Sequence, residues 1–383
     1  MCVDIIIKNE RGVFMKVFET KDIYENPLPQ LKSRQCMFPS LAELEGGTIA
    51  ASFAIGEAFE SVDSRSYICF SQDGGKSFDE PKLILDFGTD TPITDYGKLS
   101  VSNDGKLLVF GYAFERPDPT LPLGNPETGG LLDDFIFLSA SEDGGKSFSA
   151  PKRIDCAWGA HAEASAPITL LSDGSFISPI TGFADWNGNT HGKNCGRAII
   201  SHDSGGSFSD KVICMEFPGD TVTCFEQRMC QLASGAIVDI GWNEDMKTGE
   251  RLPNHYTLSY DGGKSWSKPK STGVMGQSSS VLSIGGEKLL ALHSCRRDTD
   301  RPGIYAYVVD LSRGEWDIID EKLIWEPKTP VLKDKNFAEI FAYLKFGQPS
   351  AIKLKNGDIL ATHWYQDNGT YKVAVTKIQL DGE

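Results

Sequence analysis

The sequence contains no cluster of basic residues and no long apolar run. Lysine and arginine number 38 against 53 aspartates and glutamates, a net charge of −15, which argues against a basic groove for nucleic acid. The first residues, MCVDIIIKNERGVF, hold only three consecutive isoleucines before Lys8, fewer than a secretion signal or a membrane span requires. We therefore expect a cytoplasmic protein that binds neither nucleic acid nor a membrane.

Cysteine lacks any paired pattern. The nine cysteines are an odd number without C-x-x-C spacing, which argues against a disulfide framework and against a zinc site. We expect neither a bound metal nor a cofactor.

Glycine (39) and proline (19) are abundant, as in chains with many tight turns. Four segments repeat the pattern Ser-x-Asp-x-Gly-x-x-aromatic: SQDGGKSF from residue 71, SEDGGKSF from 141, SHDSGGSF from 201 and SYDGGKSW from 259. Aspartate accepts hydrogen bonds from turn N–H groups and glycine adopts positive φ, so each of these aspartate motifs predicts a structural hairpin turn. The spacing resembles a calcium loop, but the bidentate glutamate of such a loop is missing.

A second repeat consists of six apolar segments that each meet a small turn and resume as an apolar segment, which predicts six hairpins of buried strands. Their turn glycines, 51 to 71 residues apart, are Gly47, Gly105, Gly174, Gly235, Gly286 and Gly357. An aspartate motif follows each of the first four hairpins, and VVDLSRGEW is a degenerate copy after the fifth. Four-stranded units at this period are typical of a β-propeller.

The two ends of the chain complement each other. The sixth unit stops after YKVAVTKIQL without a fourth strand, whereas VFMKVFETK at residues 13–21 alternates like a strand. We therefore predict an all-β fold: a single domain over residues 1–383, folded as a six-bladed β-propeller with four-stranded blades and with residues 13–21 as the outer strand of the last blade. A solenoid or two β-sandwiches would leave both ends unexplained.

Four aspartate motifs in a six-unit propeller resemble the sialidase (neuraminidase) superfamily, whose members carry such bacterial neuraminidase repeats, or Asp boxes. The resemblance spans nearly the whole chain and implies the scaffold of those enzymes. The motifs lie on blade turns away from the usual active site, so they imply nothing about chemistry.

In such blades the first strand begins, and the second ends, at one face near the central axis. Candidate residues before first strands are Arg34, Asp95, Tyr96, His161, Glu163, Glu226, Arg228 and Gln348; those after second strands are Glu57, Trp186, Arg296, Arg297, His363 and Trp364, with Asp63 in the loop beyond Glu57. Residues 115–134, rich in proline and glycine, are predicted as an insertion at this face, where a lid is one use and a surface loop another. The alternative interpretation is that all these residues are ordinary polar residues at solvated loop ends and do not form a functional site.

These residue types suit an acidic sugar. We predict Glu226 and Glu163 as catalytic carboxylates, Asp63 and Glu57 as their alternates, and His161 as a further acid or base. Substrate-binding residues would be arginines that hold a carboxylate and polar or aromatic groups that contact the sugar: Arg34, Arg228, Arg296, Arg297, Asp95, Tyr96, Trp186, Gln348, His363 and Trp364.

The chain departs from the family pattern of three arginines on the substrate carboxylate and a tyrosine nucleophile assisted by a glutamate. Glu226 matches the glutamate, but Phe38 replaces the first arginine and Gln348 replaces the tyrosine. Arg34 and Tyr343 are the nearest substitutes. The resemblance therefore does not imply cleavage of sialic acid by the usual tyrosine route.

The function we expect is that of a sialidase-like glycoside hydrolase acting on a terminal, acidic sugar, with a carbohydrate as its ligand. A lyase acting on a uronate polysaccharide, with histidine or tyrosine as base, is one alternative. A carbohydrate-binding propeller without activity is the other.

Overall fold

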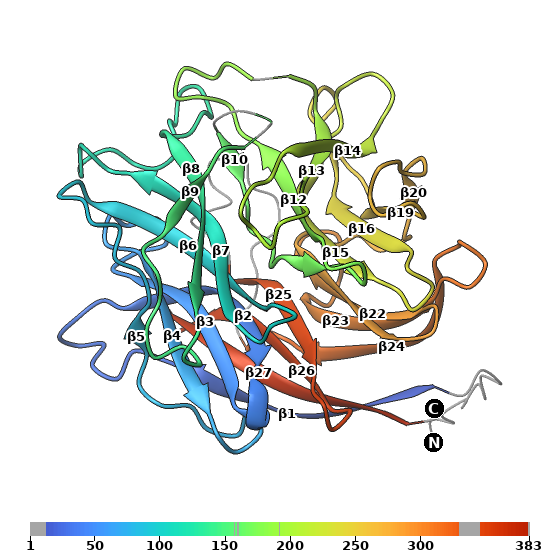
Figure 1. Ribbon diagram of the computed structural model, residues 1–383, viewed down its shortest axis with the longest axis horizontal. Coiled ribbons are helices and arrows are strands. Elements are labelled where there is room, and N and C mark those ends of the chain that lie inside the picture. Colours follow the sequence, from blue (N-terminus) through green and yellow to red (C-terminus); the bar gives the residue numbers. More distant parts are fainter. Residues whose placement is uncertain (1–12, 157, 159–160, 191, 329–344, 382–383) are drawn as a thin grey trace.

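The structure is a computed structural model that describes residues 13–156, 158, 161–190, 192–328 and 345–381. Tyr343, the substitute for the missing tyrosine, lies outside these residues. The described chain forms 27 strands and one short 3-10 helix, η1 (Glu45–Gly47). Six sheets follow one another in chain order around a common centre (Figure 1), which confirms the prediction of an all-β, six-bladed β-propeller.

The first three blades are antiparallel sheets whose strands run in order from the inner edge outward. Blade 1 comprises β2 (Gln35–Glu43), β3 (Ile49–Gly56), β4 (Arg65–Ser71) and β5 (Lys82–Leu83). Blade 2 comprises β6 (Ile93–Val101), β7 (Leu107–Glu115), β8 (Asp134–Ser141) and β9 (Lys152–Ile154). Blade 3 comprises β10 (Ala162–Glu163) and β11 (Thr169–Leu170), then β12 (Phe176–Gly182), β13 (Cys195–Ser201) and β14 (Asp210–Glu216).

The last three blades follow the same plan. Blade 4 comprises β15 (Phe225–Gln231), β16 (Ile237–Trp242), β19 (His255–Ser259) and β20 (Lys270–Ser271), with a small hairpin of β17 (Glu244–Asp245) and β18 (Glu250–Arg251) beside it. Blade 5 comprises β21 (Ser279–Gly285), β22 (Lys288–Cys295), β23 (Gly303–Asp310) and β24 (Asp317–Trp325). Blade 6 comprises β25 (Phe346–Lys353), β26 (Ile359–Asp367), β27 (Thr370–Asp381) and β1 (Phe14–Tyr24).

Blade 3 differs from the continuous hairpin that the sequence predicts. Its inner strand consists of two separate pieces, β10 and β11, which both pair with β12. Pro167 lies in the gap between the pieces and Pro179 lies opposite on β12. Neither proline has an N–H group to donate, so the ladder cannot run through this part of the blade.

The ring is closed by the N-terminal strand, as predicted. β1 pairs antiparallel with β27 from Phe14, opposite Asp381, to Tyr24, opposite Val373. The two strands lie side by side in Figure 1, β1 in blue and β27 in red. The backbone N–H of Met15 also donates to Asp320 of blade 5 (2.7 Å), so β1 bridges the last two blades.

Each aspartate motif folds as a tight turn organised by its own side chains. Asp143 accepts hydrogen bonds through Oδ1 from the N–H groups of Lys146 (3.0 Å) and Ser147 (2.9 Å). Ser141 Oγ accepts from the N–H of Gly145 (2.8 Å). The bond to the N–H group four residues on recurs at Asp73, Asp203 and Asp261.

The glycine four residues after the first serine of each motif also lies where one blade packs on the preceding one. A Cβ added there would come within 2.9 Å of an apolar side chain of the preceding blade, which is Leu360 for Gly75, Phe70 for Gly145, Leu138 for Gly205 and Ile177 for Gly263. These positions also have positive φ, between 83° and 88°. Glycine is therefore required for both the turn and the seam between blades.

The hydrophobic core is a ring of such seams. Six clusters of buried side chains each join two neighbouring blades, and one of them joins blade 6 to blade 1. No helix among the described residues has the length and hydropathy needed to cross a membrane.

We predict that deleting residues 1–24 destabilises the ring. β1 buries Met15 and Ile23, worth about 1.5–3 kcal/mol each, and its loss leaves the edge of β27 unpaired. The free energy of unfolding, measured with urea, should fall by about 3–6 kcal/mol.

A chain that lacks only residues 1–12 retains β1 and serves as the control. If the two shortened chains unfold at the same urea concentration, β1 does not close the ring in solution.

Candidate functional site

Three inner strands share the same irregularity near their first residues. In β2, β15 and β25 the pairing with the second strand shifts register, between Met37 and Ser40, between Phe225 and Arg228, and between Gly347 and Ser350. Each shift contains a non-glycine residue with positive φ: Phe38 (60°), Glu226 (47°) and Gln348 (42°). Such a conformation costs on the order of 1–3 kcal/mol per residue and clusters at functional sites.

The strained residues meet through a chain of hydrogen bonds across four blades. Lys98, on β6, donates to the carbonyl oxygen of Phe38 (2.7 Å) and to Gln348 Oε1 (3.3 Å). Gln348 Nε2 in turn donates to Glu226 Oε1 (2.5 Å). Residues of blades 1, 2, 4 and 6 can meet in this way only at the centre of the ring.

Glu163, at the end of β10, is the second carboxyl group of this centre. Its side chain is 7% exposed. Burial raises the pKa of Glu163 to about 7, and the charge of Glu226 contributes to the rise, while a hydrogen bond from Ser165 and the charges of Arg228 and Lys98 oppose it. Glu163 is therefore partly protonated at neutral pH.

Buried cations surround the two carboxyl groups. Arg228 donates to Ser165 Oγ (3.2 Å) and to the carbonyl oxygen of Gln227 (2.7 Å). Arg296 donates to Gln277 Oε1 (2.5 Å) and to the carbonyl oxygen of Phe346 (3.0 Å). With Lys98 they form a group of three basic side chains.

Burial lowers the pKa of each of these bases, to about 10 for Arg296 and well below the ordinary value for Lys98. The charge of Glu226 opposes that change at all three. Glu226 therefore lies within electrostatic reach of all three bases. Because Glu163 is partly protonated, the cluster has a surplus of positive charge.

Aromatic rings form one side of this centre. Phe38 contacts Tyr96 and Phe59 edge to face, with distances between ring centres of 5.1 Å and 5.4 Å. The ring centres of Tyr112 and Tyr96 lie 5.4 Å apart. Burial is the main cause that raises the pKa of Tyr112 well above the ordinary value, and the charge of Glu163 is the second. Tyr112 is thus a neutral hydrogen-bond donor near the carboxyl groups.

The insertion between β7 and β8 is fixed to blade 3. Asn125 Nδ2 (3.0 Å) and Thr128 Oγ1 (2.8 Å) both donate to the carbonyl oxygen of Trp186. A Cβ on Gly130 would lie 1.7 Å from the carbonyl oxygen of Asp185, so the two segments touch through their backbones. Leucines of the insertion pack on the aromatic side described above, which makes the segment a wall in this structure.

The centre brings together five residues predicted from the sequence: Glu163, Glu226, Arg228, Arg296 and Gln348. It also contains Lys98 and Tyr112, which sequence reasoning missed. The signal was present, because both are polar-tipped side chains inside segments that are predicted as buried strands. Counting from strand ends could not select them.

Several other candidates support the walls. Asp95 is fully buried and pairs with Arg65 (2.5 Å). Tyr96, His363 and Trp364 are also buried, because both faces of a blade are covered by its neighbours: Trp364 packs towards blade 1 and His363 lies against Trp325 of blade 5. Such side chains have little surface left for a ligand.

The remaining candidates lie nearer the rim. Glu57 and Asp63 are exposed, and Asp63 Oδ1 accepts from the N–H of Glu57 (3.0 Å). Arg34 donates to the Tyr24 hydroxyl (3.1 Å) and Arg297 to Glu244 (3.3 Å).

His161 and Trp186 both belong to blade 3 and are half-buried. His161 has positive φ (61°) and lies 3.7 Å from Asp133 and from Asp134. Trp186 offers its carbonyl oxygen to the insertion.

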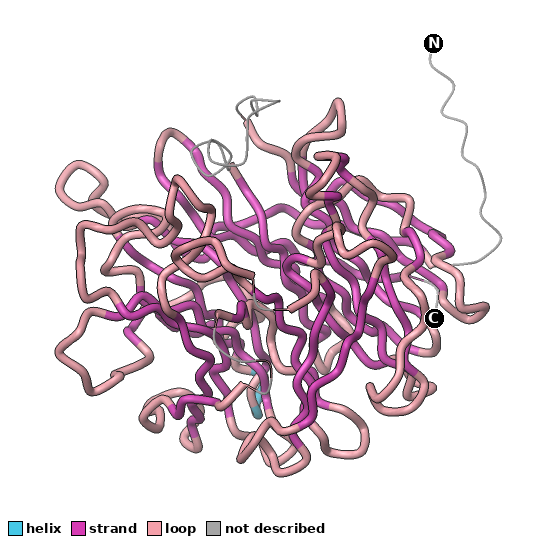
Figure 2. The backbone as a smooth tube through the Cα atoms, turned by 90° about the horizontal axis from the view of Figure 1, so that it is seen from above, coloured by secondary structure: helices cyan, strands magenta, loops and turns pink. Residues whose placement is uncertain are grey.

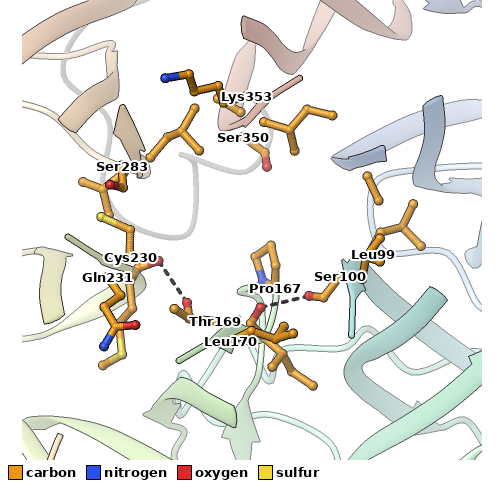
Figure 3. A pocket seen from close by; sticks show the side chains of 18 of the residues that line it. Leu99, Ser100, Pro167, Thr169, Leu170, Cys230, Gln231, Ser283, Ser350 and Lys353 are labelled. Carbon is orange, nitrogen blue, oxygen red and sulfur yellow. Dashed lines mark hydrogen bonds between the residues drawn. The ribbon is translucent and has the colours of Figure 1, made fainter. Parts of the chain in front are cut away.

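A cavity of about 720 Å³ opens among the other ends of the inner strands (Figure 3). Ser100, Thr169, Ser283 and Ser350 lie around it, and Arg228 is the residue it shares with the charged centre. Its size alone would suggest a ligand site. The paired carboxyl groups and strained backbone lie at the opposite ends of the strands, and we assign the chemistry there because acid–base work needs titratable groups.

Figure 2 shows loops projecting at both ends of the strands. Within the described residues, no three histidine, cysteine, aspartate or glutamate side chains are arranged to hold a metal ion.

No family model and no curated protein sequence matches this chain. Solved structures do match in fold. A Dyadobacter fermentans protein of unknown function is 19% identical, with a TM-score of 0.71 over 97% of this chain and 100% of its own. NanB sialidase from Streptococcus pneumoniae is 13% identical, with a TM-score of 0.63 over 94% of this chain and 70% of its own. An α-L-arabinanase from Penicillium chrysogenum is 16% identical, with a TM-score of 0.61 over 94% of this chain and 98% of its own.

At these identities the likeness shows the fold alone. The propeller of this chain is the one used by sialidases and by an arabinanase, which are glycoside hydrolases.

We predict a pH-dependent effect of replacing His363 by phenylalanine. His363 is buried beside Trp325, and burial lowers its pKa to about 3, against about 6.5 in the unfolded chain. Protons therefore bind the unfolded state preferentially from about pH 6.5 down to about pH 3. Over that range the wild type should lose stability relative to H363F by about 1.4 kcal/mol per pH unit.

Urea unfolding of both proteins at pH 7.5, 6, 5 and 4 measures this difference, and the comparison cancels the carboxyl groups common to both. A difference independent of pH would mean that His363 is solvated.

Proposed function

We propose that this protein is a glycoside hydrolase that removes a terminal, acidic sugar, with Glu163 as general acid and Glu226 as the ionised carboxylate. The observation that supports it is the pair itself: two glutamates close enough to interact at the axis, of which Glu163 has a pKa raised to about 7. Glycoside hydrolysis by two carboxyl groups needs one that is protonated and one that is ionised.

The roles follow from the surroundings. Glu163 would donate its proton to the glycosidic oxygen as the bond to the anomeric carbon breaks. Glu226, which accepts the amide of Gln348, would attack that carbon or take a proton from the attacking water. Glutamine stands at position 348, where the sialidase family has its tyrosine nucleophile. Because the amide of Gln348 is not a nucleophile, the proposed reaction uses no nucleophile at this position.

The preference for an acidic sugar is supported by the surplus of positive charge at Lys98, Arg228 and Arg296. A carboxylate on the sugar would balance it, and the guanidinium groups can hold such a group. The partly exposed rings of Phe38 and Tyr112 offer apolar surface to a sugar ring. Fold relatives include sialidases, although the arabinanase acts on a sugar without a carboxylate, so the test must include both kinds.

We predict that E226Q lowers kcat by about 100-fold or more on the glycoside that the wild type hydrolyses, and that E163Q does so on the alkyl glycoside of the same sugar, both with unchanged thermal midpoints. The panel comprises 4-nitrophenyl or methylumbelliferyl glycosides of sialic acid, glucuronic acid, galacturonic acid and arabinose. E57Q and D63N are the controls and should keep wild-type activity. If these two lose activity instead, the acid and base belong to the first blade.

The pH profile and the leaving group give a separate test of the acid. Because Glu163 must be protonated, kcat/KM should fall above about pH 7. E163Q should lose little activity on 4-nitrophenyl substrates, whose leaving group needs no proton, and much more on alkyl glycosides. Equal losses on both would rule out Glu163 as the acid.

The product distinguishes the alternatives. An unsaturated uronate that absorbs in the ultraviolet would identify a lyase, in which H161A should abolish turnover. Binding of a sugar without turnover would favour a non-catalytic propeller.

A further inference from the structure

We propose that Gln348 is the positioning residue for Glu226: its side-chain amide, oriented by Lys98, fixes the direction of the Glu226 carboxylate at the axis. The inference rests on the proposed function for its catalytic meaning, but its structural part can be tested without turnover.

The hydrogen bonds define one orientation of the amide. Nε2 lies 2.5 Å from Glu226 Oε1 and Oε1 lies 3.3 Å from Lys98 Nζ. An ionised carboxylate only accepts hydrogen bonds and an ammonium group only donates them. A reversed amide would place an acceptor against Glu226 and a donor against Lys98, so both neighbours favour the observed orientation.

The backbone fixes both ends of the contact. Glu226 and Gln348 each have positive φ within a register shift, and the N–H of Gln348 donates to Ser278 Oγ of the neighbouring blade (2.9 Å). Strained residues persist only where surrounding contacts over-determine them. We infer that the strained backbone at the two positions is what allows the side chains of Glu226 and Gln348 to make contact at the axis.

Lys98 is anchored independently of Gln348. Its ammonium group is buried and donates to the carbonyl oxygen of Phe38 (2.7 Å) as well. The third strained residue thus holds the lysine that orients the amide. Phe38 thus anchors Lys98, Lys98 orients the amide of Gln348, and Gln348 positions Glu226.

An amide suits this position because the surroundings already contain enough charge. The groups that act on Glu226 are Lys98 from β6, Glu163 from β10, Arg228 from β15 and Arg296 after β22, while Tyr112 from β7 and the buried Asp239 from β16 act on Arg228. A further cation would add to the positive surplus. A further carboxylate would repel both glutamates. A neutral donor orients Glu226 without either effect.

The test compares Q348M, which keeps the length of the side chain and removes both hydrogen bonds, with Q231M. Gln231 lies at the far end of β15 and is also bonded at both ends, to Ser172 and to Gly235. We expect Q348M to lower kcat about 10- to 100-fold, with KM changed less than kcat and an unchanged thermal midpoint. Q231M should keep wild-type kcat.

The pH profile separates positioning from a structural role. In Q348E a third carboxyl group joins the pair, so activity should be lower than in Q348M at pH 7 and should recover partly at pH 5. A loss that is equal at every pH, or one that follows the thermal midpoint, overturns the inference.

Lys98 supplies the second check. K98M should lower kcat in the same direction as Q348M, and the double variant should lose no more than the worse single variant, because both residues act through one contact. Additive losses would show that Lys98 acts on the substrate separately.

Crystal structures of the wild type and Q348M at the same pH make the outcome independent of the proposed function. If the wild type hydrolyses no glycoside of the panel, the hydrolase proposal fails, and the position of Glu226 decides the inference. A Glu226 side chain in the same place in both structures overturns it. A side chain that turns away in Q348M supports it.

Discussion

The packing of each blade against its two neighbours is the constraint on which the rest of the structure depends. No four-stranded sheet of the described chain covers its own faces, and every buried cluster joins two blades. The glycines of the aspartate motifs let the blades approach closely at these seams. Because the seams close into a ring, the six inner strands converge, and side chains far apart in sequence meet at the axis.

The centre destabilises the fold, and the packing of the ring offsets this cost. Non-glycine residues adopt positive φ at Phe38, Glu226 and Gln348, and the three bases and Glu163 lose most of their hydration. Backbone carbonyl oxygens accept from each base, so the cations also brace the irregular strand ends. Strain and buried charge concentrated in this way are typical of sites selected for chemistry rather than for stability.

Most of the scaffold could be predicted from the sequence, because turn aspartates and glycines act locally and repeat. The broken inner strand of blade 3 could not, since it depends on Pro167 facing Pro179 across the sheet. At the centre, Glu163, Glu226, Arg228, Arg296 and Gln348 were predictable from strand ends. Lys98 and Tyr112 were not, because the register of β6 and β7 relative to the axis is a tertiary property. The burial of His363 and Trp364 was not predictable either, because it depends on blades 5 and 1 covering the two faces of blade 6.

The pairing of β1 with β27 has a consequence for synthesis of the protein. β1 leaves the ribosome before the other described strands, yet its partner strand begins at Thr370, so it waits unpaired until the strands of all six blades have been made. Five blades can assemble earlier, but only as an open arc with an apolar flank at each end. The axial centre, which needs Gln348 of the last blade, forms only after that arc closes. Formation of the centre is therefore coupled to synthesis of blade 6, and a chain stopped before that blade would expose two apolar flanks to the quality-control machinery.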